Sequence, residues 1–421
     1  MAAAGDRGWT ALPARAMELR LAPTLLSGMS FRWRHRADPA ADAEPAVAMK
    51  KAAAYAGGTY VGVLGSTIYE VRENADGCAL RVHAADGCVR APTAAETSVL
   101  ARHVRLGEGA LANVWVGTVG VPVRFAQVAT VLPGVRVLRI PELEALITFV
   151  GSANNNIKRC MQMVSALCAE AGDPIGTDAY GEAHHAFPTA AQLLTLSEAR
   201  IWSLGWGYRA PRLRRLAQQL DERGGEAYLA GLRDLNDEEA RESLCELCGV
   251  GRKVADCVLL FGYARDAVVP VDTHCFQLAA RLLLPSIRGK PLTAATYQLI
   301  VDRFHEVFGA ELAGWAFMTL FVGELSDFRR LVDDAPVDES SAVGSSENSD
   351  TVGTASAPED AKVGEADHEG APSDECFTRS RRRTRARLTH AARPPAQLSR
   401  RCSRRSVRAA RSAAKSPYFA D

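Results

Sequence analysis

Lys253 and Asp272 are the two residues whose types and positions could do chemistry together. Lys253 follows a Gly-Val-Gly turn and lies in the first turn of a predicted helix, where a cation slightly disfavours the helix itself. Asp272 follows Val-Pro-Val and precedes an apolar helical stretch. A neutral, desolvated amine can attack an electrophilic carbon, and a carboxylate beside it can stabilise an oxocarbenium ion. The pair therefore points to chemistry at an N-glycosidic bond.

Both residues also have an ordinary structural explanation. Lys253 could be a solvated surface lysine. Asp272 could be a helix N-cap, whose carboxylate accepts hydrogen bonds from the first amides of the next helix. For Asp272 the two roles are compatible, because capping would also fix the orientation of a carboxylate held at the mouth of a cleft.

The residues before the lysine predict a helix–hairpin–helix over 237–261. Asn236, followed three residues later by Glu239, has the spacing of a capping box. The turn at 249–251 then interrupts the helical pattern, and its glycines let the backbone approach another surface. The N–H groups that open the next helix bind anions such as phosphates. A loop at 266–274, which carries Asp272, follows the second helix. This order of elements predicts that the hairpin binds a nucleic-acid backbone beside the amine and the carboxylate.

Two other polar segments could contact nucleic acid. Asn154-Asn155-Asn156 lies between two apolar helical faces, where asparagines favour caps and turns. It could be a capped helix corner, or a polar cluster that enters a gap in DNA, because amides both donate and accept hydrogen bonds. Tyr208 and Arg209 on a Gly-rich loop could stack on bases and hydrogen-bond to them, although such a pair is a weak signal alone.

The ten cysteines are scattered, without the dense spacing of a disulfide framework, which suits a reducing compartment. Cys245-x-x-Cys248 has no second such pair, and no closely spaced quartet follows it. We therefore predict neither a zinc site nor an iron–sulfur cluster, and no required cofactor. A cation held by backbone carbonyls of the hairpin stays open.

The chain is predicted to be an α+β protein in three parts. Residues 16–35 and 55–140 alternate β-type runs with Gly turns, which predicts an antiparallel sheet domain with helices over 1–140, interrupted by a loop at about 37–51. Residues 141–330 have helical periodicity and predict an all-helical body, within which 314–325 is apolar nearly all round and should be buried. Residues 331–421 are poor in apolar residues and predict a disordered tail, acidic and then basic.

The net charge of +1 hides this uneven distribution. Thirteen acidic residues and one lysine lie between Asp333 and Glu375, and fourteen Lys and Arg without any acid lie between Arg379 and Lys415. The basic part could be a nuclear address, a nonspecific DNA-binding arm or only a solvated tail. We expect a nuclear protein, and the Ala- and Arg-rich N-terminus leaves a mitochondrial pool open. Neither a membrane span nor a secretory signal is predicted.

Six motifs occur in one order over roughly residues 18–330. Through them the chain resembles the eukaryotic 8-oxoguanine DNA glycosylase/AP lyases of the helix–hairpin–helix glycosylase superfamily. The motifs are SGMSFRW (27–33), NNNIKR (154–159), LGWGYRA (204–210), CGVGRKVADC (248–257), VPVDTH (269–274) and AGWAFMTLF (313–321). The fourth and fifth together are the most specific.

This resemblance implies the catalytic residues and a pocket for the damaged base. Lys253 matches the lysine that attacks C1′ and forms a Schiff base, and Asp272 matches the catalytic aspartate. In the pocket, Gly28 matches a glycine whose carbonyl meets the N7–H of the oxidised base. The matching pocket residues are Gly28, Cys257, Phe261, Phe317 and Phe321, with Cys257 and Phe321 on the two faces of the base.

The resemblance also implies a set of DNA-binding residues. They are Asn154, Arg159, Tyr208, Arg209, Gly249, Val250, Gly251 and His274. In the family pattern the asparagine and the two arginines face the orphan cytosine, the tyrosine is the wedge between bases, and the histidine lies near a phosphate of the lesion.

Three positions depart from the family pattern. Phe317 stands where a glutamine usually reads the Watson–Crick edge of the base, and a phenyl ring cannot hydrogen-bond there. Phe261 replaces a methionine of the pocket, and Cys248 replaces a proline of the turn. The endonuclease III branch, which carries four clustered cysteines after the aspartate, is disfavoured because only Cys275, Cys376 and Cys402 follow here.

The resemblance implies a bifunctional enzyme of base excision repair, acting as a monomer on double-stranded DNA. It would flip out and excise 8-oxoguanine, and formamidopyrimidine lesions, opposite cytosine, and then cleave 3′ of the abasic site by β-elimination. Flipping is needed because a lysine cannot reach a base inside a duplex, and burial or a neighbouring cation would favour the neutral amine. The alternatives are a related glycosylase for another purine lesion, or a noncatalytic DNA-binding module.

Overall fold

The computed structural model describes residues 8–14, 18–36, 58–74, 77–108 and 112–335. These residues all fall in one compact unit. The loop predicted at 37–51 and the tail predicted from 331, apart from its first five residues, lie outside the described residues.

The predicted antiparallel sheet is confirmed. Its spatial order is β1-β5-β4-β3-β2, with β6 paired to β5, and every pairing is antiparallel. Gly62 leaves room for the ring of its cross-strand partner Trp33, because a Cβ there would lie 2.4 Å from that ring. The strands are β1 (Thr10–Ala11), β2 (Trp33–Arg36), β3 (Thr59–Leu64), β4 (Thr67–Asn74), β5 (Gly77–His83) and β6 (Val89–Arg90).

After β6 the chain turns helical sooner than predicted. The described residues between 91 and 140 contain helices joined by turns and irregular segments, where the sequence suggested continued β-type runs. Thr93 and Glu96 form a capping box that begins the first long one, a signal overlooked in the sequence. The helices of this part are α1 (Leu21–Leu25), α3 (Ala94–His103) and α4 (Val123–Val131), and α4 packs against α15 and α16.

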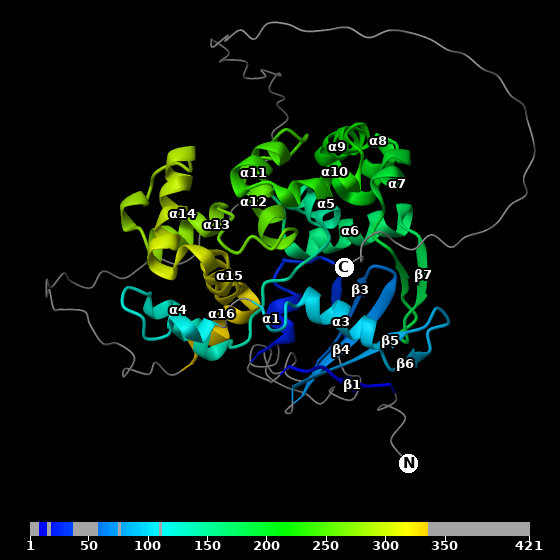
Figure 1. The fold of residues 1–421 in the computed structure, drawn as a ribbon, viewed down its shortest axis with the longest axis horizontal. Helices are drawn as coiled ribbons and strands as arrows, with labels where there is room; N and C mark the ends of the chain where they lie inside the picture. The colour runs from blue at the N-terminus through cyan, green and yellow to red at the C-terminus, as the bar shows by residue number, and fades with distance from the viewer. Residues whose placement is uncertain (1–7, 15–17, 37–57, 75–76, 109–111, 336–421) are drawn as a thin grey trace, which may run out of the picture. The chain divides into compact units, whose positions relative to one another are not determined.

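The predicted helical body is confirmed, with helices around the hairpin (Figure 1). They are α5 (Glu142–Ser152), α6 (Ile157–Ala171), α7 (Ala190–Thr195), α8 (Glu198–Ile201), α9 (Ala210–Arg223), α10 (Glu226–Gly231), α11 (Asp237–Cys245), α12 (Arg252–Phe261), α13 (Thr273–Leu282), α14 (Ala294–Phe308), α15 (Ala313–Glu324) and α16 (Ser326–Asp333). Short helical turns are η3 (Ala112–Trp115), η4 (Trp202–Trp206), η5 (Gly207–Arg209), η6 (Leu232–Asp234), η7 (Pro285–Ile287) and η8 (Ala310–Leu312).

One element of this body contradicts the all-helical prediction. β7 (Pro174–Thr177) and β8 (Ala183–His185) form a two-stranded hairpin. Ile175 packs on Val61, Val63 and Ile68 of the sheet, and the Arg36 guanidinium lies 2.9 Å from the Asp178 carboxylate. Strands this short, with a proline and a glycine, have no period of their own, so their contacts with the large sheet stabilise them.

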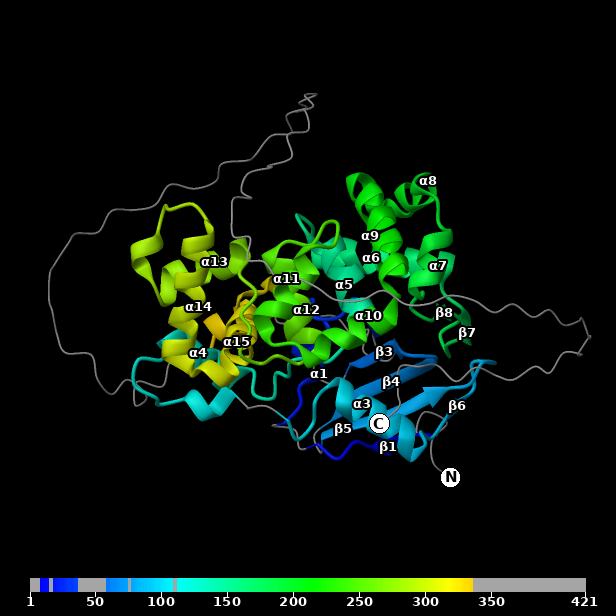
Figure 2. The same cartoon turned by 45° about the horizontal axis from the view of Figure 1, so that its top comes forward.

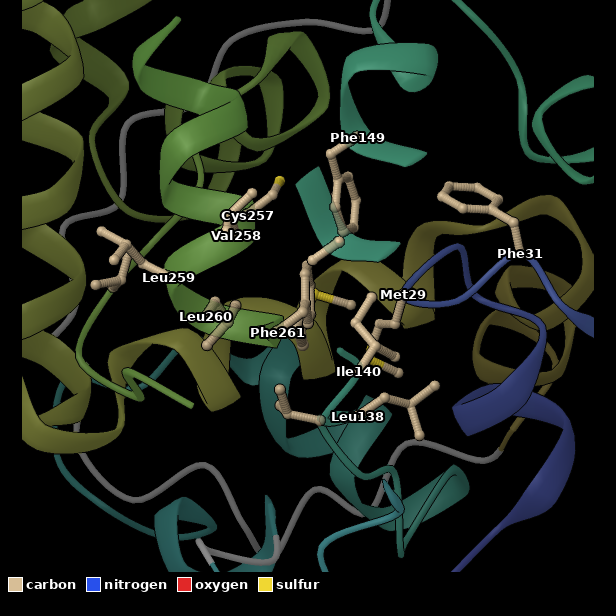
Figure 3. Close-up of a cluster of buried hydrophobic side chains, with 14 of the residues drawn as sticks. Met29, Phe31, Leu138, Ile140, Phe149, Cys257, Val258, Leu259, Leu260 and Phe261 are labelled. Atoms are coloured by element: carbon tan, nitrogen blue, oxygen red, sulfur yellow. The ribbon is translucent and has the colours of Figure 1, made fainter. Parts of the chain in front are cut away.

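The hydrophobic core continues from the sheet into the helices. Every residue of α12 from Val254 to Phe261 is buried, and α12 packs against α5 and α11. Phe149 stacks on Phe261 with their ring centroids 5.2 Å apart, and Phe31 meets Phe149 edge-on at 5.9 Å (Figure 3). Burying side chains of this size contributes about 1.5–3 kcal/mol each, so this cluster anchors the helix that carries Lys253.

The predicted buried helix at 314–325 is confirmed as α15. Gly323 allows close packing, because a Cβ there would lie 2.3 Å from Val128 of α4. The next helix, α16, extends to Asp333, three residues beyond the predicted boundary of the body, because Val332 is buried. Among the described residues no single helix is long and apolar enough to cross a membrane, and α14 and α15, bent by 112°, reach that length and composition only together.

His103 joins the sheet to the segment that leads into the helices. The Trp33 indole N–H donates to its Nε2 at 3.0 Å, and its Nδ1 lies 2.8 Å from the Arg139 carbonyl, which assigns the proton to Nδ1. Both ring nitrogens are thus satisfied in the neutral form. Burial lowers the pKa of His103 to about 4, slightly offset by the hydrogen bond to the carbonyl.

Stability is therefore expected to fall under mildly acidic conditions. An unfolded histidine has a pKa near 6.5, so the unfolded state binds more protons than the folded state between pH 6.5 and about 4. Above that window the neutral His103 should contribute fully to the free energy of unfolding. As the pH falls through the window, protonation of this histidine in the unfolded state should lower the free energy of unfolding by roughly 3 kcal/mol. Urea denaturation should show a smaller pH dependence for His103→Gln, whose amide can keep both hydrogen bonds; equal pH dependence in both proteins would contradict the assignment.

Candidate active site

The hairpin forms where the sequence predicts it. Asn236 caps α11 by accepting hydrogen bonds from the amides of Glu238 and Glu239, both at 3.0 Å, and the capping box is complete. Gly249 has φ +83°, a conformation that glycine favours. Gly251 is different: its backbone is extended, and a Cβ there would meet no atom within 4 Å. The fold therefore does not need a glycine at 251, which leaves space for an external partner.

No side chain caps the start of α12, so its first N–H groups keep their capacity to bind an anion. Val250, between the two glycines, is buried and its amide donates to the Leu247 carbonyl at 3.1 Å. Figure 2 shows α11 and α12 side by side, with α13 next to α12. The turn is thus fixed to the core by the buried Val250, and the N–H groups that follow it have no side-chain cap.

Lys253 and Asp272 come together across this hairpin and the following loop. The Lys253 Nζ lies 4.0 Å from Oδ2 of Asp272, and both side chains are 29% exposed. The other carboxylate oxygen, Oδ1, caps α13 by accepting from the amides of His274 at 3.0 Å and Cys275 at 2.9 Å. The two roles considered for Asp272 are therefore divided between its two oxygens. The cap orients the carboxylate, and the free oxygen faces the amine.

The surroundings of Lys253 raise the pKa of its amine, which favours the protonated form at neutral pH. Burial lowers the pKa of Lys253, but its interactions with Cys257 and with the Asp272 carboxylate raise it by more, so the pKa lies above its ordinary value. Burial raises the pKa of the Cys257 thiol to about 11, so at neutral pH this group is neutral and Asp272 supplies the charge. Burial alone therefore does not make the amine neutral, contrary to expectation.

The predicted pocket residues lie at two groups of aromatic rings. Phe261 belongs to the first group and is deeply buried, stacked on Phe149. Lys253 Nζ lies 5.4 Å from the centroid of the Phe149 ring, so this ring, besides stacking on Phe261, makes a cation–π contact with the amine. Cys257 is buried beside them (Figure 3). Gly28 has φ +84°, and a Cβ there would lie 3.0 Å from Ile157.

The second group lies on α13 to α15. Phe317 is only 4% exposed and meets Phe304 edge-on at 6.0 Å. Phe321 lies 5.8 Å from Phe317 and is half-buried, and the exposed His274 ring meets it edge-on at 6.4 Å. The structure therefore brings His274, Phe321 and Phe317 into one series that runs from the surface inward, with no hydrogen-bonding group on Phe317.

In the asparagine triplet, different residues have the two predicted roles, the capped helix corner and the outward polar group. Asn156 caps α6 by accepting from the Arg159 amide at 2.9 Å, and the Asn155 amide group donates to the Gly151 carbonyl at 3.0 Å. Asn154 is exposed and has φ +50°, a conformation uncommon outside glycine. Two asparagines thus build the corner, and the third is presented outward. Arg159 is also exposed, in the first turn of α6.

Arg209 is placed differently from a base-contacting arginine. It is 3% exposed, and its Nη2 donates to the carbonyls of Ala153 and Asn154, the latter at 2.9 Å. Its guanidinium lies over the Tyr208 ring, 4.3 Å from the centroid. In this unbound structure Arg209 therefore supports the loop that presents Asn154. Tyr208 is 48% exposed, which suits an aromatic ring that enters a duplex.

Comparison with known proteins identifies the family. The chain is 34% identical over 328 residues to the N-glycosylase/DNA lyase OGG1 of Arabidopsis thaliana, a match that covers 76% of this chain and 81% of that protein. This chain belongs to the OGG1 family. The N-glycosylase/DNA lyase of Saccharomyces cerevisiae is 35% identical over 237 residues, 51% of this chain and 61% of that protein. No family model matches the chain.

Solved structures share the fold of this OGG1-family chain. The apo form of the Clostridium acetobutylicum 8-oxoguanine glycosylase/lyase has a TM-score of 0.57 at 24% identity, covering 72% of this chain and 93% of that one. The same enzyme in complex with double-stranded DNA containing cytosine opposite 8-oxoguanine has a TM-score of 0.56 at 23% identity, with coverages of 72% and 91%. The OGG1-family chain is thus an enzyme, an N-glycosylase/DNA lyase.

The cysteines of this OGG1-family chain form no metal site among the described residues, where no three His, Cys, Asp or Glu side chains gather to bind an ion. Cys245 is exposed and Cys248 is half-buried in the turn. The OGG1 family lacks an iron–sulfur cluster, which agrees with the disfavoured endonuclease III branch. A cation on the hairpin carbonyls stays a prediction.

Two residues of the OGG1-family site were missed in the sequence. Phe149 lies under the amine, and its only signal was an aromatic residue shortly before the asparagine triplet. Arg212 is exposed, with its guanidinium 5.6 Å from the centroid of the Tyr208 ring. A Cβ on Gly249 would lie 3.5 Å from its side chain. Arg212 therefore lies between the exposed tyrosine and the hairpin turn, and its signal was a cation four residues after Tyr208.

Arg212→Gln is expected to weaken binding to both damaged and undamaged duplexes. Loss of one phosphate contact should reduce the slope of log K against log salt concentration by about 1. The measurement is a fluorescence-anisotropy titration at several salt concentrations. Arg90→Gln is the matched control, because Arg90 is an exposed arginine of the sheet paired with Glu96. Equal slopes for wild type and Arg212→Gln would contradict a phosphate contact.

Proposed function

We propose that this OGG1-family enzyme is a bifunctional glycosylase and AP lyase that excises 8-oxoguanine, and formamidopyrimidine lesions, opposite cytosine in base excision repair. The single observation that carries the proposal is the approach of the Lys253 amine to the uncapped oxygen of Asp272, 4.0 Å apart, beside the open end of the hairpin. An amine and a carboxylate beside a phosphate-binding turn are the groups that attack at C1′ of a nucleotide requires.

In the proposed reaction Lys253 is the nucleophile. After losing a proton, its Nζ donates a lone pair to C1′ of the flipped nucleoside. The bond from C1′ to the base breaks, and its electron pair leaves with the base, which takes up a proton. The Asp272 carboxylate stabilises the positive charge that develops on the sugar.

The lyase step follows from the same amine. Opening of the sugar ring converts the C1′–Nζ bond into a protonated imine, the Schiff base. Loss of a C2′ proton then expels the 3′ phosphate with its bonding electrons, which is β-elimination. Water attacks C1′ of the imine and releases the lysine. Lys253 thus links excision of the base to cleavage of the strand.

The DNA-facing residues have complementary proposed roles. Tyr208 and Asn154, both exposed, fill the space left by the flipped nucleotide, and Asn154 and Arg159 contact the orphan cytosine. Arg209 donates from Nη2 to the carbonyls of Ala153 and Asn154, so contact of this nitrogen with the cytosine requires it to exchange these partners on binding. The half-buried Phe321 and the exposed His274 suit the pocket mouth and a phosphate nearby.

In this proposal the two faces and the N7 position of the base are recognised, whereas its Watson–Crick edge is not. Cys257 and Phe321 stack on the faces of the oxidised base, and the Gly28 carbonyl accepts from N7–H, a proton that guanine lacks. An acceptor that faces a lone pair instead costs about 1–3 kcal/mol, enough to discriminate. Phe317 offers no hydrogen bond to the Watson–Crick edge. This apolar edge favours, as a second candidate, activity on another purine lesion.

The decisive experiment compares duplexes that differ in one base pair. The full chain is incubated with 8-oxoguanine opposite C, 3-methyladenine opposite T and undamaged G opposite C, and released bases and strand breaks are measured with and without borohydride. We expect release of 8-oxoguanine, cleavage without alkali and a covalent complex. Release of 3-methyladenine alone would support the second candidate. Binding without release of either base would indicate a noncatalytic DNA-binding module.

A further inference from the structure

A buried hydrogen-bond network connects the helix that carries Lys253 with the loop that carries Asp272. Its centre is Asp256 on α12, which is 1% exposed. Arg241 of α11 donates through Nε to Oδ1 of Asp256 at 2.6 Å. The Tyr297 hydroxyl, from α14, donates to Oδ2 at 2.5 Å. A buried carboxylate requires partners of this kind, and here they come from two other helices.

The same hydroxyl also accepts a hydrogen bond. The backbone N–H of Val271 donates to the Tyr297 oxygen at 2.9 Å, and both residues are buried. Val271 directly precedes Asp272, and Asp256 is one turn along α12 from Lys253. One oxygen atom therefore joins the two segments on which the reacting groups sit.

The ring of Tyr297 adds a second contact on the lysine side. The guanidinium of Arg252, the residue before Lys253, lies 4.2 Å from the centroid of that ring, and its Nη2 donates to Gln298 at 2.6 Å. The hydroxyl thus joins α12 to the loop, whereas the ring contacts α12 alone. Phenylalanine at this position would keep the ring contact and remove both hydrogen bonds of the hydroxyl, the one to Asp256 and the one from Val271.

We propose that Tyr297 is a positioning residue that sets the separation of the Lys253 amine and the Asp272 carboxylate. This role rests on the function proposed above. Without the hydroxyl, the Val271 N–H is left buried without its acceptor, and the loop must shift to satisfy it. Because Asp272 is the next residue, that shift moves its carboxylate away from the amine. The cap on α13 does not prevent this, since it holds the carboxylate to its own helix.

The test compares Tyr297→Phe with Tyr263→Phe. The Tyr263 hydroxyl is also buried and donates to the Leu229 carbonyl at 2.7 Å, so its removal costs a similar hydrogen bond without touching the loop. We measure the single-turnover rate of borohydride trapping on saturating 8-oxoguanine duplex, and the Kd for a duplex carrying a tetrahydrofuran abasic analogue. Tyr297→Phe should trap about 10–100-fold more slowly, with a Kd within about threefold of wild type. Tyr263→Phe should keep the wild-type rate.

The pH profile separates positioning from a loss of stability. The Asp272 carboxylate raises the pKa of Lys253, so moving it away should lower that pKa. The pH of half-maximal trapping should therefore shift downward in Tyr297→Phe and stay unchanged in Tyr263→Phe. If Tyr297→Phe does not fold, Asp256→Asn, which keeps the side-chain volume, should slow trapping while preserving Kd.

Each outcome bears on the proposal. Wild type that borohydride does not trap overturns the proposed function and this role with it. If wild type is trapped, and Tyr297→Phe or its substitute Asp256→Asn is trapped at the same rate as wild type, only the role of Tyr297 is overturned. Equal slowing in Tyr263→Phe, without a shift of the pH profile, also overturns it, because any buried hydroxyl would then have the same effect.

Discussion

Lys253→Gln is expected to lose strand cleavage and borohydride trapping, with a fall in base release of at least about 10³-fold. Glutamine retains most of the length of lysine but has no amine to attack C1′. The lysine side chain is 29% exposed and close to one carboxylate, so its replacement should leave the fold and DNA binding intact. Single-turnover assays on 8-oxoguanine duplex, with the covalent complex resolved by denaturing electrophoresis, measure all three quantities.

The matched control is Lys290→Gln, since Lys290 is an exposed lysine in the connection before α14. It should trap at the wild-type rate. If Lys253→Gln is trapped as efficiently as wild type, the nucleophile is another amine and the proposed mechanism is wrong. Loss of DNA binding together with activity would instead assign Lys253 to holding the backbone.

Asp272→Asn is expected to slow base release by about 10²–10³-fold with little change in stability. The amide keeps an oxygen that can accept from the amides of His274 and Cys275, so the cap on α13 survives. What it loses is the negative charge that faces Lys253 and the developing oxocarbenium ion. Single-turnover base release and urea denaturation of the same preparations separate these effects.

Asp272→Ala provides the contrasting variant. It should lose the same charge and also about 1 kcal/mol of unfolding free energy, because no oxygen remains to cap α13. Equal stability of the two variants would contradict the division of labour between the carboxylate oxygens. Wild-type rates in Asp272→Asn would mean that capping alone is the function of this residue.

The same substitution has an expected pH signature. The Asp272 carboxylate contributes to the raised pKa of Lys253, so its neutralisation should lower that pKa. Because the neutral amine is the nucleophile, the fraction available at a given pH below the pKa rises as the pKa falls. The rising limb of trapping against pH should therefore move to lower pH in Asp272→Asn, although the plateau is lower. A limb that stays in place would remove Asp272 as a source of the raised pKa.

Several features could be predicted from the sequence because they depend on neighbouring residues. The capping box at Asn236 and Glu239 and the turn at 249–251 are local patterns, and they placed the hairpin correctly. The position of Asp272 before an apolar helix predicted its cap, which the structure confirms. The apolar character of α15 nearly all round likewise predicted a buried helix. The family resemblance added the expected roles.

Other features could not be predicted in this way. The hairpin of β7 and β8 has no periodic pattern, because contacts with the sheet stabilise it. Arg209 was predicted as a base-contacting residue, yet its Nη2 donates to carbonyls of a segment more than fifty residues earlier. A side chain type does not indicate which backbone groups it will meet, so exposure and partners required coordinates.

The sequence by itself determined the candidate reacting groups and the local elements that carry them, since Lys253 lies in the first turn of a helix and Asp272 caps one. Only the tertiary structure decided their 4.0 Å separation and the raised pKa of the amine. Both depend on packing between segments distant in the chain, such as the contact of Tyr297 with Asp256. Local patterns create helices and caps, whereas the distance between side chains on two different segments is set by everything packed between those segments.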